Sequence, residues 1–147
     1  MLLLDKELLA ALKALGEAAY PNEGCGLLLG GSHNGINTVQ ALHPVPNSWE
    51  NVEERRIRFR IDEMDWLDAE MKAEDHGLEI IGVFHSHPDH PPVASPRDLA
   101  WAAWPGFSYL ITEVHDGKPL GSRSWLLRED RTGFLEEEIK INDTNIA

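Results

Sequence analysis

Apolar residues recur along this chain with two periods, and Gly, Pro and Asn residues mark the places where the period changes. A period of three to four residues in the N-terminal segment is carried by Leu4, Leu8, Leu9, Leu12 and Leu15. It predicts a long helix that Asp5 caps and that ends before Pro21. A second amphipathic helix is expected after Asp62. Its apolar face comprises Met64, Leu67 and Met71.

Short apolar or alternating runs predict strands in most of the remaining segments. These runs cover residues 24–31, 36–42, 57–61, 79–85, 109–114, 122–127 and 134–141. Asn34-Gly35 and Asp116-Gly117 are typical turn sequences between strands. With a short helix expected over 96–103, the pattern predicts one α/β domain over residues 1–147. Its mixed β-sheet is flanked by the long N-terminal helix, the second amphipathic helix and the short helix.

The 147 residues carry a formal net charge of −12 at pH 7, from 13 Lys and Arg against 25 Asp and Glu. Such a chain is a poor partner for nucleic acid or an anionic membrane. The acidity fits simple solubility or a salty cytoplasm, and steering toward a basic partner surface stays open. No stretch has the features of a signal peptide or a transmembrane helix, so we expect a cytoplasmic protein. Cys25 is the single cysteine, which excludes an intramolecular disulfide and a Cys-rich zinc ribbon.

The sequence His85-Ser86-His87-Pro88 contains most of the chemical information in the chain. Side chains at positions i and i+2 of a strand project from the same face, about 6–7 Å apart at the backbone, so both imidazoles reach one ion. Pro88 ends the strand, because it has no N–H to donate to a neighbouring strand. With Asp98 a short loop away, the segment offers three ligands and leaves a fourth position for water, as in hydrolytic zinc centres.

Ser95, Pro96 and Asp98 also have a structural interpretation, because together they form a helix-start signature. Capping and metal binding compete for the Asp98 carboxylate. Next to the two histidines we favour Asp98 as the third ligand, with the helix start fixing the direction in which it points.

A hydrolytic centre also needs a proton acceptor, and spacing alone does not select one among the many acids of the chain. Glu23 is the best candidate, because it lies in the segment Pro21–Gly26 just before a predicted buried strand. The glycines of that segment let other backbone approach closely, so an acid there is not a plain surface charge.

These residues resemble the motif of the JAMM (MPN-plus) metalloproteases, in which a glutamate is followed much later by His-Ser/Thr-His-Pro, six residues, Ser, two residues and Asp. The resemblance spans Tyr20 to about Leu127 and implies the fold of that family. The ligands that it implies for one Zn²⁺ per chain are His85, His87 and Asp98. It also implies that Glu23 is the general base and that Ser95 hydrogen-bonds the oxyanion of the tetrahedral intermediate. Ala94 departs from the family pattern, since many members have proline there.

Within that family the chain looks most like the compact bacterial and archaeal members, because Pro21–Gly30 and Gly77–Pro88 are similar to their segments. Those members act on ubiquitin-like (β-grasp) sulfur-carrier proteins and cut after the C-terminal Gly-Gly. The resemblance therefore implies hydrolysis of a peptide or isopeptide bond that releases cysteine, a C-terminal extension or a conjugate. The identity of the carrier, the pathway, and the choice between monomer and homodimer stay open.

Four further residues are candidate substrate contacts, each with a plainer alternative. They are Asn47, Trp49, His90 and Trp101. Asn47 and Trp49 lie in the polar loop expected over the site. His90 is also explained as a solvated loop histidine, and Trp101 by core packing together with Trp104.

Three other functional classes compete with a metallopeptidase. A non-catalytic MPN-type scaffold that binds a ubiquitin-like protein is the main alternative, and the complete ligand set argues against it. A zinc deaminase needs a Pro-Cys-x-x-Cys motif, which one cysteine cannot supply. A related DNA-repair branch carries an added N-terminal DNA-binding region with no counterpart here, and a charge of −12 does not suit DNA.

Overall fold

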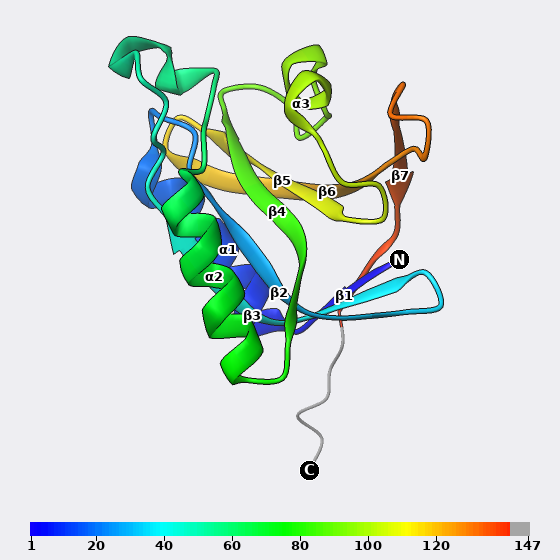
Figure 1. Ribbon diagram of the computed structural model, residues 1–147. Helices are drawn as coiled ribbons and strands as arrows, with labels where there is room; N and C mark the ends of the chain where they lie inside the picture. Colours follow the sequence, from blue (N-terminus) through cyan, green and yellow to red (C-terminus); the bar gives the residue numbers. More distant parts are fainter. Residues whose placement is uncertain (142–147) are drawn as a thin grey trace.

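The computed structural model describes residues 1–141, in which a mixed β-sheet is packed between helices (Figure 1). The strands are β1 (Leu2–Leu4), β2 (Cys25–His33), β3 (Ile36–Val45), β4 (Glu79–Pro88), β5 (Ser108–His115), β6 (Lys118–Leu127), β7 (Phe134–Glu137) and β8 (Ile139–Ile141). The helices are α1 (Lys6–Ala19), α2 (Glu63–Asp75), α3 (Pro96–Trp101) and the 3₁₀ helix η1 (Val52–Arg56). Among the described residues, no helix is long and apolar enough to span a membrane.

The strand order β7-β6-β5-β4-β2-β3-β1-β8 combines parallel and antiparallel neighbours, as predicted. β4 pairs with β5, and β1 with β3 and β8, in parallel, while the remaining pairs are antiparallel. The β2–β3 and β5–β6 turns place Asn34-Gly35 and Asp116-Gly117 at positive φ, which confirms the turns expected from these sequences. One residue separates β7 from β8 although they form opposite ends of the order, so the sheet curls toward closure.

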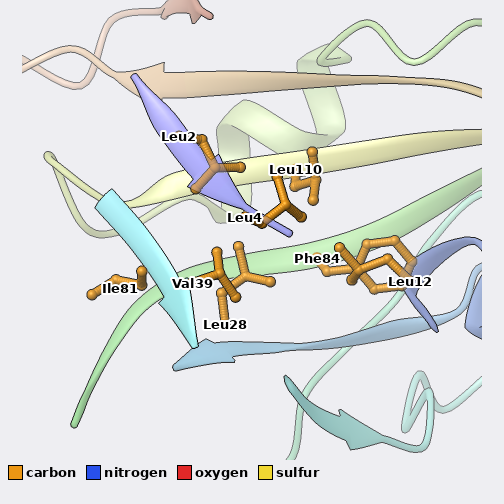
Figure 2. Close-up of a cluster of buried hydrophobic side chains, with 8 residues drawn as sticks. All are labelled: Leu2, Leu4, Leu12, Leu28, Val39, Ile81, Phe84 and Leu110. Atoms are coloured by element: carbon orange, nitrogen blue, oxygen red, sulfur yellow. The ribbon is translucent and has the colours of Figure 1, made fainter. Parts of the chain in front are cut away.

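Helices α1 and α2 cover opposite faces of the sheet. Figure 2 shows the cluster on the α1 face, made of Leu2, Leu4, Leu12, Leu28, Val39, Ile81, Phe84 and Leu110. The cluster on the α2 face comprises Leu27, Ala69, Val83, Tyr109 and Leu127. Neighbouring residues of one strand, such as Val83 and Phe84, belong to different clusters because side chains alternate along a strand.

This alternation places the two motif histidines of β4 on the α2 face. His85 lines a cavity there together with Trp66 of α2, and the next residue, Ser86, points to the α1 face, where a Cβ atom on Gly16 would lie 3.1 Å from the Ser86 Cβ. His87 is again on the α2 face, so the prediction that both imidazoles project from one side of the strand is confirmed.

The strand predicted over 57–61 is wrong, because these residues form an irregular segment after η1. The nearest strands, β2 and β4, are already paired on both sides, so the segment has no free strand edge to join. The alternation instead reflects Phe59 and Ile61, which pack against the cluster on the α2 face.

The apolar face predicted for α2 is also wrong in its orientation. Its members Met64, Leu67 and Met71 are between 46% and 62% exposed. The residues that pack against the sheet are Ala69 and Ala73, whose small side chains let the helix approach closely.

The ends of the described chain add two strands that the sequence did not predict separately. β1 precedes α1 and contributes two core leucines, and the run predicted over 134–141 divides into β7 and β8 at Glu138. The predicted domain also includes residues 142–147, which lie outside the described part, so its full extent stays a prediction.

Two adjacent glycines of β2 test the close packing of the sheet. A Cβ atom on buried Gly30 would overlap the backbone carbonyl of Thr38 on β3, whereas on exposed Gly31 it would meet no described atom within 4 Å. We expect Gly30→Ala to lower the free energy of unfolding by at least about 2 kcal/mol, because the clash is with backbone. Gly31→Ala is expected to change it by less than about 0.5 kcal/mol. Urea denaturation of both variants checks this, and equal stabilities would contradict the register of β2 on β3.

Candidate functional site

The predicted site residues meet at the C-terminal end of β4. The segment just before β2 supplies Glu23, β4 supplies His85 and His87, and the N-terminus of α3 supplies Ser95 and Asp98. Figure 1 shows the end of β4 between the η1 segment and α3. Residues far apart in the sequence are thus brought to one place.

A reciprocal pair of hydrogen bonds holds Glu23 beside the histidines. The N–H of Gly24 donates to Ser86 Oγ at 2.8 Å, and the N–H of Ser86 donates to the carbonyl of Gly24 at 3.0 Å. The next residue, Cys25, pairs with His85 in the β2–β4 ladder. Ser86 and Glu23 are both buried, so this connection across 62 residues is shielded from water.

The segment from Asn47 to Arg60 supports Glu23 from the other side. The N–H of Glu23 donates to the carbonyl of Arg55 at 2.7 Å, and Asn47 Nδ2 donates to the carbonyls of Glu23 and Arg58. Asn47 Oδ1 accepts from the N–H groups of Trp49 and Arg60. The Asn47 amide therefore orders this loop, and the substrate contact proposed for it stays a prediction.

Three potential metal-ligand side chains converge at the end of β4. His85 Nε2 lies 3.0 Å from Asp98 Oδ1, His87 Nε2 lies 3.1 Å from Asp98 Oδ2, and the two Nε2 atoms are 3.1 Å apart. Ligands at zinc–nitrogen distances of about 2.0–2.1 Å in a tetrahedron stand roughly 3.3 Å from one another. Both histidines are 1% exposed, and Phe59 stacks on the His85 ring at 4.6 Å. The separation and burial fit one metal ion.

The tautomer of His87 strengthens this fit. Its Nδ1 lies 2.8 Å from the carbonyl oxygen of Pro91, which accepts but cannot donate, so Nδ1 carries the hydrogen. In the neutral ring, Nε2 then presents a lone pair toward the Asp98 carboxylate and His85. Acceptors that face one another at this distance without a hydrogen between them repel, and a divalent cation removes the repulsion. The residues present therefore fit a metal ion.

Asp98 takes part in a complete capping box at the start of α3. Its Oδ2 accepts from the N–H of Ser95 at 2.8 Å, and Ser95 Oγ accepts from the N–H of Asp98 at 3.1 Å. The sequence interpretation treated capping and the approach to the histidines as competing, but the same carboxylate does both. Burial alone would raise the pKa of Asp98, yet the neighbouring His85 and the Ser95 N–H outweigh it and hold the pKa well below its usual range.

Glu23 is the acid of this centre whose pKa is raised by burial. Its side chain is buried, and Oε1 has no hydrogen-bond partner among the described residues. Burial raises the pKa of Glu23 to about 8, and the nearby His87 partly opposes the rise. A carboxyl group with this pKa can gain or lose a proton near neutral pH.

The remaining predicted site residues surround the centre. His90 stacks on His87 with ring centroids 4.1 Å apart. Trp101 is 63% exposed on α3 and lines a cavity of about 480 Å³ together with His85 and Asp98. Trp49 packs edge-on against Trp101 at 5.8 Å. Their roles as substrate contacts stay predictions, although Trp101 borders the space that a substrate would enter.

Three residues that position the centre were not singled out by the sequence. Ser86 was noted only as part of the motif, Phe59 was placed on a strand, and Asp89 was given no role. Asp89 accepts from the hydroxyl of Tyr20 and from the N–H of Asp116, so it fixes the loop after β4 to α1 and to the β5–β6 turn. Its positive φ of 60° is tolerated by aspartate and could not be inferred from spacing.

Comparisons with known proteins agree with this arrangement. Residues 5–128 match the family described as prokaryotic homologs of the JAB domain. Over 91 residues the chain is 38% identical to the desampylase of Haloferax volcanii, covering 62% of each chain. Over 84 residues it is 32% identical to a probable TtuB-protein conjugate cleaving protease of Thermus thermophilus, covering 57% of this chain and 51% of that protein. The matches thus span less than two thirds of either relative's length.

A solved structure resembles the whole fold. The solution structure of a protein from Desulfitobacterium hafniense matches with a TM-score of 0.82 and 32% sequence identity, over 97% of this chain and 93% of that one. The layout of the sheet and its three α-helices is therefore shared with a measured structure.

Removal of the Ser86 hydroxyl tests the connection to Glu23. We expect Ser86→Ala to lower the free energy of unfolding by about 1–3 kcal/mol, because the buried N–H of Gly24 loses its side-chain acceptor. Urea denaturation measures the loss, and amide hydrogen exchange at Gly24 should accelerate. Ser32→Ala, at an exposed position of β2, is the matched control and should change neither quantity. Unchanged exchange at Gly24 in Ser86→Ala would contradict the role given to this hydroxyl.

The reactivity of Cys25 tests whether a thiol could act at this site. Cys25 is buried, and burial raises its pKa from 9.0 to about 12. At pH 8 the thiolate is therefore about a thousandfold scarcer than in the unfolded chain, and access is blocked as well. We expect the native protein to react with Ellman's reagent at least about a thousandfold more slowly than the protein in guanidinium. A native rate within tenfold of the unfolded one would contradict this.

Proposed function

The chain belongs to the family of prokaryotic homologs of the JAB domain, and from this membership we propose that it is a zinc-dependent hydrolase of ubiquitin-like sulfur-carrier proteins. The bond cut is the peptide or isopeptide bond after the C-terminal Gly-Gly of the carrier. Membership also confirms the resemblance seen in the His-Ser-His-Pro motif. The observation that carries the activity is the convergence of His85, His87 and Asp98 beside the buried acid Glu23.

His85, His87 and Asp98 would hold the zinc ion, because two imidazoles and a carboxylate are a typical donor set for catalytic zinc. A zinc ion bound there supplies Lewis acidity, which makes water a nucleophile near neutral pH. Two of these ligands are held in place by further hydrogen bonds: His87 Nδ1–H donates to the Pro91 carbonyl, and Asp98 accepts from the Ser95 N–H. These contacts orient the ligands before any substrate arrives.

Glu23 accepts the proton of the attacking water and returns it to the leaving amine. Its unpartnered Oε1 is free to take a hydrogen bond, and its pKa of about 8 lies close to the pH at which it must exchange protons. The hydrogen bonds from Asn47 and to Arg55 keep the backbone of Glu23 fixed during both transfers.

Ser95 donates its hydroxyl hydrogen to the oxyanion that forms during the attack. The oxygen of this hydroxyl already accepts from the Asp98 N–H, so its orientation is set and its hydrogen remains for the substrate. Capping and oxyanion stabilisation therefore use different parts of one group.

The burial of the centre supports a narrow, extended substrate. Glu23, His85 and His87 are at most 2% exposed, so the scissile bond must be carried inward on a thin chain. Two glycines without side chains satisfy this requirement. The cavity beside His85, lined by Phe59, Trp104 and other apolar side chains, has room for the residues that precede them.

The names of the relatives support the same substrate class. One is a desampylase and another a probable protease that cleaves protein conjugates of TtuB. Because these matches are partial, the carrier, the released group and the partner of this chain are proposals. A cytoplasmic location, a monomeric or homodimeric state and the lack of nucleic-acid binding remain predictions.

A carrier fusion tests the proposal directly. The probe is a β-grasp sulfur carrier ending in Gly-Gly, fused to a short C-terminal peptide, with products identified by mass spectrometry. We expect cleavage after the second glycine, about one zinc per chain, and loss of cleavage on treatment with a chelator. Glu23→Gln should keep the zinc and slow cleavage about 100- to 10,000-fold, because only the proton acceptor is lost.

Glu74→Gln, at an exposed position of α2, removes the same charge away from the site and should leave zinc content and rate unchanged. Cleavage by Glu23→Gln at the wild-type rate would show that another group is the base. Protein that takes up no zinc and cuts no carrier fusion would restore the non-catalytic scaffold interpretation.

A further inference from the structure

The loop between β4 and α3 reaches the metal centre through one hydrogen bond. The Pro91 carbonyl accepts from His87 Nδ1 at 2.8 Å, which leaves the lone pair of the neutral ring on Nε2, toward the other two ligands. Pro91 has no N–H and no polar side chain, so other residues must hold its carbonyl in place. We propose that Asp89 and Trp125 are positioning residues for His87 and act through this carbonyl.

Asp89 holds the loop where it leaves β4. Its N–H donates to the carbonyl of Val114 at 2.8 Å. Its carboxylate accepts from the hydroxyl of Tyr20 at 2.7 Å and from the N–H of Asp116 at 2.8 Å. One residue is thus bonded to three others, which come from the C-cap of α1, from β5 and from the β5–β6 turn.

Trp125 holds the loop at Pro92. Its indole Nε1 donates to the carbonyl of Pro92 at 3.1 Å. The backbone of Trp125 is fixed within the sheet, since β6 pairs there with β5 on one side and with β7 on the other. The indole also packs against the cluster on the α2 face. A donor on a rigid strand therefore determines where Pro92 lies.

The Pro91 carbonyl lies between these two contacts. The proline rings fix φ at Pro91 and Pro92, so few backbone torsions between residues 89 and 92 remain free. With both contacts in place, the carbonyl is aimed at His87 before any ion binds. Loss of either contact frees the loop, and the imidazole then loses the bond that selects its tautomer and ring orientation. Zinc affinity falls, because binding must then select both.

A purely structural role for the same contacts would have a different signature. If Asp89 and Trp125 only stabilised the fold, losing their hydrogen bonds would lower the free energy of unfolding and leave the folded site unchanged. A positioning role also alters His87 in the protein that stays folded. The inference rests on the metal ligands of the proposed function, but exchange of the His87 Nδ1 hydrogen with solvent reports on it without any metal.

Trp125→Phe and Asp89→Gly each remove one contact. Phenylalanine keeps the aromatic packing and lacks the N–H, and glycine keeps the positive φ of residue 89 without the carboxylate. Proton NMR of the zinc-free protein follows the His87 Nδ1 hydrogen, which is assigned by its absence in His87→Gln. We expect this hydrogen to exchange about tenfold or more faster in each variant, because opening of the loop exposes it. Zinc dissociation constants, measured by competition with a chromophoric chelator, should rise about tenfold, the lower end of the range for losing such a hydrogen bond.

Asp130→Gly is the matched control, because Asp130 also accepts two hydrogen bonds in a turn, from the N–H and the hydroxyl of Thr132. It should leave both quantities within about twofold of wild type. Asp89→Asn retains one acceptor oxygen, so it should lie between wild type and Asp89→Gly, and it replaces the glycine variant if circular dichroism shows that variant to be unfolded.

Wild-type exchange of the His87 hydrogen in both Trp125→Phe and the Asp89 variant would overturn the inference. Unchanged zinc affinity in both variants of a protein that binds zinc would overturn it as well. A wild-type protein that takes up no zinc would defeat the proposed function, whereas the exchange measurement would still decide whether these residues position His87.

Discussion

The two hydrogen bonds between Gly24 and Ser86 are the connection on which the rest of the centre depends. They join the residue before β2 to the strand that carries both histidines, and they lie where water does not reach. Since β2 and β4 are adjacent in the sheet, the sheet pairing brings Glu23 near the end of β4 and these bonds fix its distance from His87. The pairing register of β2 and β4 thus brings the acid and the two imidazoles of the site to one place.

The sequence predicted the residues of the candidate site better than the segments that surround it. His85, His87 and Asp98 are close along the chain, so strand alternation and a helix start determine their meeting, and Glu23 was found through its glycine-rich segment. The segment around Phe59 was assigned to a strand because alternation reports which side chains are buried and does not report hydrogen-bond partners. The prediction of which face of α2 packs on the sheet was wrong for a similar reason. Helical periodicity does not show that two alanines, Ala69 and Ala73, face the sheet.

The proline-rich loop after β4 contributes through its carbonyl groups. Pro88, Pro91 and Pro92 accept hydrogen bonds from His90, His87 and the indole of Trp125, respectively. Proline has a carbonyl but no N–H, so such a loop supplies acceptors without adding donors that need partners of their own. It can therefore fix the tautomers of two neighbouring imidazoles at a buried place where an unpaired N–H would be costly. The sequence analysis singled out only Pro88, as the residue that ends the strand. The carbonyl contacts of all three prolines could not be inferred from residue spacing.

The contact between Trp49 and Trp101 has a different kind of consequence. The two indoles meet edge-on at 5.8 Å, one from the loop before η1 and one from α3, next to the cavity that reaches His85. Arg58 lies over the Trp49 ring at 5.0 Å, and Trp101 is largely open to solvent. Any motion that separates the loop from α3 alters the coupling and the solvation of both chromophores. Two of the five tryptophans of the chain thus lie next to the cavity, so part of the protein's ultraviolet emission responds to such a motion without any added dye.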